Sequence, residues 1–401
     1  MKKIIILATI ATQLFVACHS QILKRAKKIH RDALTIDTHC DTPMSFMRGN
    51  FDPGVRHDPN KDGSKVDFIR MKEGGLDAQF FAAFLGQGPR NPEAHQKAIQ
   101  KTSDIIDSIY AVVGRNIGLA EIATSPEDAL RLEKEGKCAI YIGIENGYGL
   151  GNDLSNVKKF YEKGARYITL CHTKNNDICD SSTDTLEHRG LSNFGKAVVA
   201  QMNDVGMMID VSHISDDAFY DVLRLSKQPV IASHSCARAL CDNPRNLSDD
   251  MLLKIKENGG VIQMCILSEY VKELPTSIAH DSARTAWRKK YPSYSDLSES
   301  QKEIARQEWY AFNQQFPAPL ATVSDAVDHI DHIVRLIGID HVGIGTDFDG
   351  GGALKDCFDV SEMGNITEEL VRRGYSKKEI EQIWGGNFMR VFKAVDQHKK
   401  I

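Results

Sequence analysis

Eight short apolar runs recur along the chain, and longer stretches with helical spacing separate them. The runs do not alternate apolar and polar residues, which is typical of strands buried on both faces of a parallel sheet. They cover residues 34–39, 78–84, 138–145, 167–172, 207–213, 229–234, 260–267 and 341–347. Eight strand–helix units in about 380 residues predict an α/β chain folded as a (β/α)8 TIM barrel. A doubly wound parallel sheet is the structural alternative.

The segments between the runs have the spacing of amphipathic helices. Between residues 94 and 113, apolar side chains recur at helical intervals, for example at Ala98 and Ile105, which predicts a helix with one buried face. Ser215 and Ser248 each precede two aspartates. That pattern predicts a helix start at both places.

One segment interrupts the rhythm of strands and helices. Residues 272–318 contain charged and aromatic helical sequence, and Pro317 and Pro319 lie at its end. The segment falls between strands seven and eight and is too long for a simple connection. We therefore expect a helical insertion there, which serves as a lid or as an oligomer contact.

The first residues have the pattern of a signal peptide. Lys2 and Lys3 precede an apolar stretch over residues 4–14, and a short basic head before such a stretch is typical of export signals. The stretch is too short to span a bilayer as a stable helix. We expect a signal peptide over residues 1–17 and one barrel domain over residues 18–401.

Cys18 suggests how the exported chain is attached. It follows Ala17 directly, which resembles the bacterial lipoprotein box, in which the cysteine thiol is lipidated after cleavage. Simple secretion after Ala17 or Ser20 is the alternative. We expect the protein in the cell envelope, as a lipid-anchored bacterial lipoprotein or in the periplasm.

Charge and cysteine content exclude two classes of site. The formal net charge is -4, so the chain lacks the basic surplus of a nucleic-acid-binding protein. The nine cysteines do not form CxxC pairs, which argues against a thiolate zinc site. We expect Cys138, Cys171 and Cys265, which lie in or beside apolar runs, to be free and buried.

Side chains that bind metals follow six of the eight runs. They are His39 and Asp41 after strand one, Glu145 after strand three, His172 after strand four, His213 after strand five, His234 after strand six and Asp347 after strand eight. In a (β/α)8 barrel the carboxyl ends of the strands meet at one mouth, where active sites lie. Buried imidazoles and carboxylates gathered there need a cation, and this donor set suits zinc. Their number exceeds what one zinc ion uses, which favours two ions bridged by a carboxylate. Asp210 is expected to support His213 rather than to bind metal.

Several local motifs, taken in order, resemble the membrane dipeptidase (renal dipeptidase) family of zinc peptidases. They include Asp37-Thr38-His39-Cys40-Asp41, residues 143–147, residues 170–175, residues 206–215, residues 233–250, residues 343–350 and residues 385–392. The similarity covers residues 30–397 apart from the insertion. Matches at the strand ends make the resemblance specific.

The resemblance implies a role for each site residue. His39 and Asp41 would bind one zinc ion, His213 and His234 would bind the other, and Glu145 would bridge the two. His172 would contact the scissile carbonyl or the tetrahedral intermediate. Arg245, in Asn243-Pro244-Arg245-Asn246, would hold the substrate carboxylate. Asp347 would lie near the free amine and the leaving group.

The function expected from these residues is hydrolysis of dipeptides by a binuclear zinc site through a metal-bridging hydroxide. The resemblance is also compatible with a homodimer. One alternative is another metal-dependent amidohydrolase of the same barrel fold. However, strand one carries His39-X-Asp41 where those enzymes usually have His-X-His. The other alternative is a non-catalytic surface-binding lipoprotein, which the loss of a ligand would favour, and none is missing.

Overall fold

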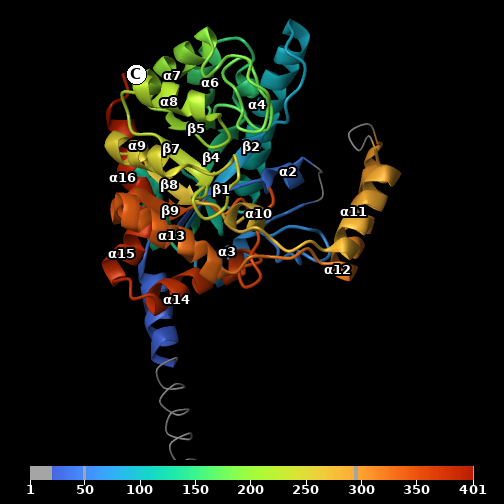
Figure 1. The fold of residues 1–401 in the computed structure, drawn as a ribbon, viewed down its shortest axis with the longest axis vertical. Coiled ribbons are helices and arrows are strands. Elements are labelled where there is room, and N and C mark those ends of the chain that lie inside the picture. The colour runs from blue at the N-terminus through green and yellow to red at the C-terminus, as the bar shows by residue number, and fades with distance from the viewer. Residues whose placement is uncertain (1–19, 48–50, 293–296, 401) are drawn as a thin grey trace, which may run out of the picture.

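A ring of eight parallel strands forms the centre of the molecule (Figure 1). The computed structural model describes residues 20–47, 51–292 and 297–400. The strands, in their order around the ring, are β1 (Ile36–Cys40), β2 (Ala78–Phe84), β4 (Cys138–Glu145), β5 (Ala165–Thr169), β6 (Met208–Asp210), β7 (Ile231–Ser235), β8 (Val261–Met264) and β9 (Val342–Ile344). The predicted TIM barrel is confirmed, and the doubly wound alternative is wrong.

The ring closes where the segment after β9 returns to β1. The Asp41 backbone N–H donates to the Phe348 carbonyl at 2.9 Å, and the Asp347 N–H donates to the His39 carbonyl at 3.1 Å. Below them, the buried Asp37 carboxylate accepts hydrogen bonds from the Thr346 N–H and hydroxyl. Closure therefore depends on the same segments that carry three of the predicted site residues.

A ninth strand lies outside the ring. β3 (Ala120–Ile122) pairs with β4 only. The prediction missed it because three residues between two helices are too few to show a period.

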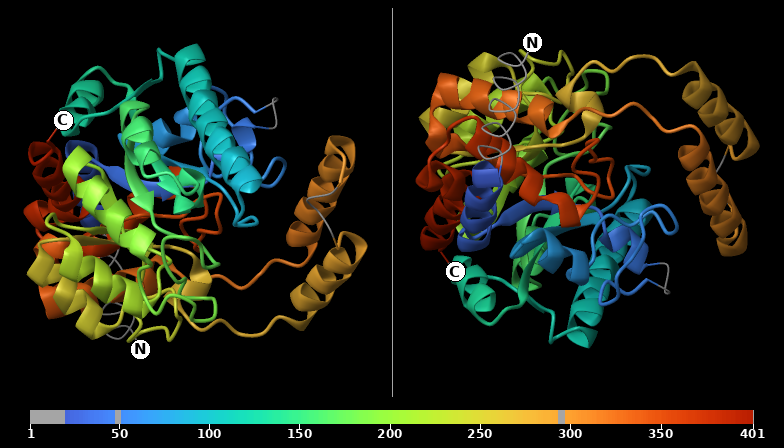
Figure 2. Two further views of the ribbon diagram at one scale, coloured as in Figure 1. Left: turned by 90° about the horizontal axis from the view of Figure 1, so that it is seen from above. Right: turned by 90° about the horizontal axis from the view of Figure 1, so that it is seen from below.

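Helices surround the strands, as Figures 1 and 2 show. A first helix covers residues 20–32. The longer ones that follow are α4 (Pro92–Arg115), α5 (Pro126–Lys134), α6 (Ser155–Glu162), α7 (Asn193–Val205), α8 (Asp216–Leu225), α9 (Asp249–Asn258), α13 (Val323–Ile337), α14 (Gly364–Arg372) and α16 (Asn387–Gln397). Short elements are α2 (Pro43–Phe46), α3 (Phe68–Gly74), η1 (Gly147–Leu150), α10 (Ser268–Val271), η3 (Ile339–His341), η4 (Val360–Glu362), α15 (Lys377–Glu381) and η5 (Gln382–Gly386). The predicted helix starts are confirmed, because the hydroxyls of Ser215 and Ser248 cap α8 and α9.

The end of the barrel where the strands begin is filled by apolar side chains. Phe80 and Tyr141 stack with ring centroids 4.8 Å apart, and α16 inserts Phe388 and Phe392 against them. All four side chains are buried. This closed end leaves the opposite end, where the strands finish, as the polar mouth.

The insertion is a helical hairpin. Its helices α11 (Ile278–Lys290) and α12 (Glu299–Gln315) lie between β8 and β9, which are the predicted strands seven and eight. Two extended connections hold the hairpin beside the barrel (Figures 1 and 2). The hairpin has its own aromatic core, in which the rings of Trp287 and Trp309 lie 4.9 Å apart.

Some expectations concern residues outside the described part of the chain. The signal peptide over residues 1–17 and the lipidation site at Cys18 both lie there. Within the described ranges, no helix is both long and apolar enough to cross a membrane. The prediction that Cys138, Cys171 and Cys265 are free and buried is confirmed.

We expect Phe392→Ala to lower the free energy of unfolding by about 3–5 kcal/mol, because it opens a cavity in the closed end of the barrel. Urea unfolding followed by circular dichroism measures this change. Leu253→Ala, at a 39% exposed position on α9, is the control and should change stability by less than about 0.5 kcal/mol. Equal effects of the two substitutions would contradict a core role for α16.

Candidate metal centre

The predicted site residues meet at the mouth of the barrel, although they are far apart in the sequence. His39 and His234 lie within β1 and β7, and Glu145 ends β4. Asp41 follows β1 directly, and the other three predicted barrel residues do not end their strands as expected. His172, His213 and Asp347 lie three residues beyond β5, β6 and β9. His213 and Asp347 adopt φ angles of 72° and 61°, which lie in the left-handed region and are not those of a strand.

Glu145 lies at the centre of the group. Its Oε2 is 3.5 Å from Nε2 of His39. Its Oε1 is 3.1 Å from Nε2 of His213, 3.7 Å from Nε2 of His234 and 3.8 Å from Nε2 of His172. The two oxygens of one carboxylate therefore face different histidines.

Two further carboxylates complete the His39 side. Nε2 of His39 lies 3.8 Å from Asp41 Oδ2 and 3.9 Å from Asp347 Oδ1. His234 lies between the two sides, because its ring stacks on His39 and its Nε2 is 2.9 Å from Nε2 of His213.

Three overlapping groups of these side chains offer ligand atoms within 4.8 Å of one another. They are His39 with Glu145 and His234, Glu145 with His172 and His213, and His39 with Asp41 and Asp347. Glu145 and His39 each belong to two groups. A shared carboxylate between overlapping groups is the arrangement that a pair of ions would use.

Burial shifts the pKa values of these histidines and carboxylates. It lowers the pKa of His172 to about 4 and the pKa values of His213 and His234 well below the usual range, with the Arg245 charge acting in the same direction. These imidazoles are therefore neutral near pH 7, which is the form that binds metal. Burial also raises the pKa values of Asp41 and Asp347.

Two buried ligand atoms have no hydrogen-bond partner among the described residues. They are Nε2 of His39 and Oδ1 of Asp41. Buried polar atoms without a partner are costly. Divalent metal ions would satisfy both atoms and offset the repulsion among the three carboxylates, so the residues present fit such a cofactor.

A tyrosine determines the tautomer of His39. The Tyr167 hydroxyl donates to the Thr38 carbonyl at 3.1 Å and lies 2.8 Å from Nδ1 of His39. Since its proton is used on Thr38, the hydroxyl accepts the His39 Nδ1–H. Nε2 of His39 is then the ring nitrogen that faces the carboxylates of Asp41, Glu145 and Asp347.

Asp210 supports a different histidine from the one expected. Its carboxylate accepts from the Ser233 hydroxyl at 2.6 Å and from the Ser233 N–H at 2.8 Å. The same hydroxyl lies 2.8 Å from Nδ1 of His234, so Asp210 orients His234 through Ser233. The expectation for His213 was wrong because the Asp210 side chain reaches across to the neighbouring strand β7.

Arg245 and His172 lie beside the buried histidines of the mouth, next to His234 and His213 respectively. The Arg245 side chain is buried, donates to the His234 carbonyl at 3.2 Å and lies over the Tyr270 ring. Its Nε has no hydrogen-bond partner among the described residues. The His172 side chain is 24% exposed, more than those of the other three histidines of the site. It can therefore meet a molecule that enters from solvent.

Gly350, which had no role among the predicted site residues, makes room for two carboxylates. A Cβ atom at this position would collide with Oδ2 of Asp41 and Oδ1 of Asp347. The close approach of this loop to both carboxylates therefore requires glycine. In the sequence, the position of Gly350 close to Asp347 could have indicated this role.

Comparison with known proteins places this site in a family. The family model described as "Membrane dipeptidase (Peptidase family M19)" matches residues 23–401. The chain is 31% identical to dipeptidase tcpJ of Claviceps purpurea, over 90% of this chain and 76% of that protein. It is 32% identical to dipeptidase 3 of Homo sapiens, over 93% of this chain and 67% of that protein.

Solved structures of similar fold agree. The probable dipeptidase PvdM from Pseudomonas aeruginosa superposes with a TM-score of 0.80 at 32% identity, covering 94% of this chain and 99% of that one. A metallo peptidase from Rhodobacter sphaeroides, liganded with a phosphinate mimic of the dipeptide L-Ala-D-Ala, has a TM-score of 0.73 at 20% identity, covering 90% and 99%. The second likeness concerns the fold alone.

We expect Ser233→Ala to weaken metal binding about 10–100-fold, because it breaks the link that orients His234. Competition with a chromogenic chelator measures the affinity. Thr169→Val is the matched control, since the Thr169 hydroxyl also donates to Asp210 but contacts none of the four histidines. A loss of the same size in both variants would contradict the link through Ser233.

Proposed function

This chain belongs to the membrane dipeptidase family of metallopeptidases, and on that basis we propose that it hydrolyses dipeptides with two zinc ions as cofactor. It is a metallo-dipeptidase, a hydrolase that acts on peptide bonds. We further propose that the ions are two in number, that both are zinc, and that single residues have the roles given below. The observation that carries this proposal is that the two oxygens of Glu145 face different histidines.

The proposed ligands form two sets joined by that carboxylate. His39 and Asp41 would hold one ion, His213 and His234 would hold the other, and Glu145 would be shared between them. Imidazole nitrogen and carboxylate oxygen are donors that zinc accepts. When bound, two such ions supply a hydroxide near neutral pH and polarise the peptide carbonyl.

Other residues act on the substrate. His172, neutral and partly exposed, donates a hydrogen bond to the carbonyl oxygen as negative charge develops there, and losing such a donor typically costs about 10²–10³ in kcat. Asp347 lies beside Asp41 and His39. It pairs with the free amine, and it passes to the departing nitrogen the proton that the attacking water releases as the C–N bond breaks.

Arg245 limits the length of the substrate. Its buried guanidinium pairs with the C-terminal carboxylate of the substrate. Its Nε–H, which has no partner among the described residues, is available to donate to that carboxylate. Because Asp347 holds the amine at the other end, the site fits a short zwitterion. This is why we propose dipeptides rather than longer peptides.

Activity with and without metal tests the proposal. We expect hydrolysis of L-Ala-L-Ala or L-Ala-D-Ala that is lost on chelation and restored by zinc. Hydrolysis confined to cyclic amides would favour an amidohydrolase of another type. Binding of dipeptides without turnover would favour a surface-binding protein.

We expect Arg245→Lys to lower kcat/KM for dipeptides about 10-fold or more, because a lysine loses the bidentate pair with the carboxylate. Zinc content, measured by mass spectrometry of the purified protein, should stay unchanged. If zinc content falls in parallel with turnover, Arg245 is part of the metal site and the assignment is wrong.

We also propose export of the protein and lipidation at Cys18, which is supported by the basic head and the apolar stretch of residues 4–14. In a bacterial host, the protein should fractionate with membranes and incorporate labelled palmitate. Cys18→Ala should abolish labelling and release the protein from membranes. Labelling that persists in Cys18→Ala would contradict lipidation at this residue.

A further inference from the structure

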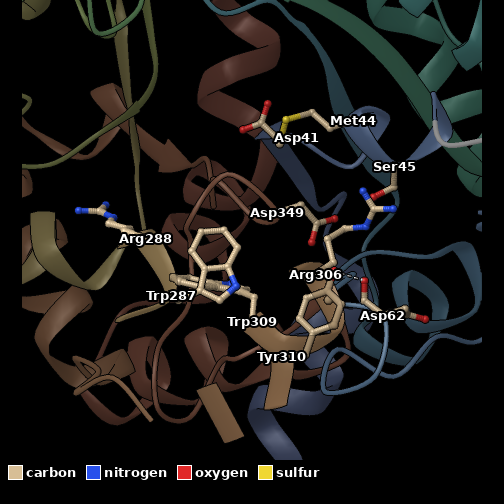
Figure 3. A pocket seen from close by; sticks show the side chains of 11 residues that line it. Asp41, Met44, Ser45, Asp62, Trp287, Arg288, Arg306, Trp309, Tyr310 and Asp349 are labelled. Carbon is tan, nitrogen blue, oxygen red and sulfur yellow. Dashed lines mark hydrogen bonds between the residues drawn. The ribbon is translucent and has the colours of Figure 1, made fainter. Parts of the chain in front are cut away.

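A cavity of about 380 Å³ lies between the barrel mouth and the helical hairpin α11–α12 (Figure 3). Asp41 and Met44 line it from the barrel, and Trp287, Trp309 and Tyr310 line it from the hairpin. None of these five residues except Asp41 has a role in the proposed mechanism. The cavity is thus an extension of the site that the family motifs do not describe.

The hairpin is held in place over this cavity. The Tyr310 hydroxyl donates to the Asp62 carbonyl at 2.7 Å, and the Gln314 side chain donates to the Asn60 carbonyl at 2.5 Å. Both acceptors lie in the loop between α2 and α3. These contacts fix the aromatic side chains opposite Met44.

The cavity opens onto one end of the metal centre. Asp41, a proposed ligand, lines it and lies in the same group as His39 and Asp347. Arg245 lies outside the cavity lining and packs against His234 and Tyr270. A dipeptide whose carboxylate is on Arg245 and whose amine is on Asp347 would direct its first side chain toward the cavity.

We propose that this cavity is the subsite for the side chain of the substrate's N-terminal residue and that it selects large apolar side chains, aromatic ones above all. This inference rests on the proposed dipeptidase function. Indole faces and a thioether form favourable contacts with aromatic rings. The volume is near the lower limit of small-molecule sites, which suits one side chain.

The charges around the cavity do not favour a charged side chain. Arg288 and Arg306 contribute two guanidinium groups to the lining, and Asp41, Asp62 and Asp349 contribute three carboxylates. Asp41 is a proposed ligand whose charge an ion would offset, so the two remaining carboxylates balance the two guanidinium groups and the lining favours an uncharged side chain. An aromatic ring can instead lie against a guanidinium face.

The test compares kcat/KM for L-Phe-L-Ala, L-Ala-L-Ala and L-Ala-L-Phe in the zinc-loaded enzyme. We expect Trp309→Ala to reduce the preference for L-Phe-L-Ala over L-Ala-L-Ala about 10-fold. Met44→Ala, on the opposite wall, should reduce it in the same direction without touching the hairpin. Ile304→Ala is the control, because Ile304 is 57% exposed on the same helix as Trp309, and it should leave the preference unchanged.

Two outcomes would overturn the subsite. Equal losses of kcat/KM for L-Phe-L-Ala and L-Ala-L-Ala in both Trp309→Ala and Met44→Ala would show that the cavity does not bind the first side chain. A loss confined to L-Ala-L-Phe would assign the cavity to the second residue. Should Trp309→Ala fail to fold, Met44→Ala alone decides between these results. Absence of any dipeptide hydrolysis by the unmodified enzyme would instead overturn the proposed function.

Discussion

Burial of one carboxylate among four imidazoles is the constraint on which the rest of this structure depends. Glu145 lies within 3.8 Å of a ring nitrogen of His39, His172, His213 and His234. Two more buried carboxylates lie beside His39. Such a group leaves Nε2 of His39 and Oδ1 of Asp41 without hydrogen-bond partners among the described residues, and bound cations would offset the cost of burying them. The barrel can therefore be understood as a frame that brings these side chains together and excludes water from them.

The two ends of the barrel have different roles, one in stability and the other in chemistry. The end where the strands begin is closed by aromatic packing between the strands and α16, which supplies stability without polar groups. The end where the strands finish carries nearly all of the chemistry. The mouth contains strained backbone, since His213, Asp347 and Asp349 all have positive φ angles. Strong packing at the closed end of the barrel offsets this strain. A non-glycine residue with such a φ angle typically costs about 1–3 kcal/mol of folding free energy.

Support for the metal centre comes from side chains one layer below the ligands. Tyr167 orients His39, Ser233 and Asp210 orient His234, and Asp37 ties β1 to the segment after β9. The Tyr167 contact crosses the barrel from β5 to β1, the Asp210–Ser233 contact joins the neighbouring strands β6 and β7, and the Asp37 contact joins the two ends of the ring. The hairpin α11–α12 adds a wall outside this frame. It lies where a substrate would project its side chain, so the same chemistry can be given a different selectivity by changing one inserted segment.

The sequence by itself determined the number of barrel strands, the order of the candidate ligand residues along the barrel and the place of the insertion. These follow from local patterns: an apolar run of strand length, a polar residue at its end, and a stretch too long for a loop. Only the tertiary structure decided that Asp210 serves His234, that β3 pairs outside the ring, that Gly350 makes room for two carboxylates, and that the hairpin faces the mouth. Each of these depends on which segments become neighbours in space, and no local period encodes the direction of a side chain across two strands or the path of a long insertion.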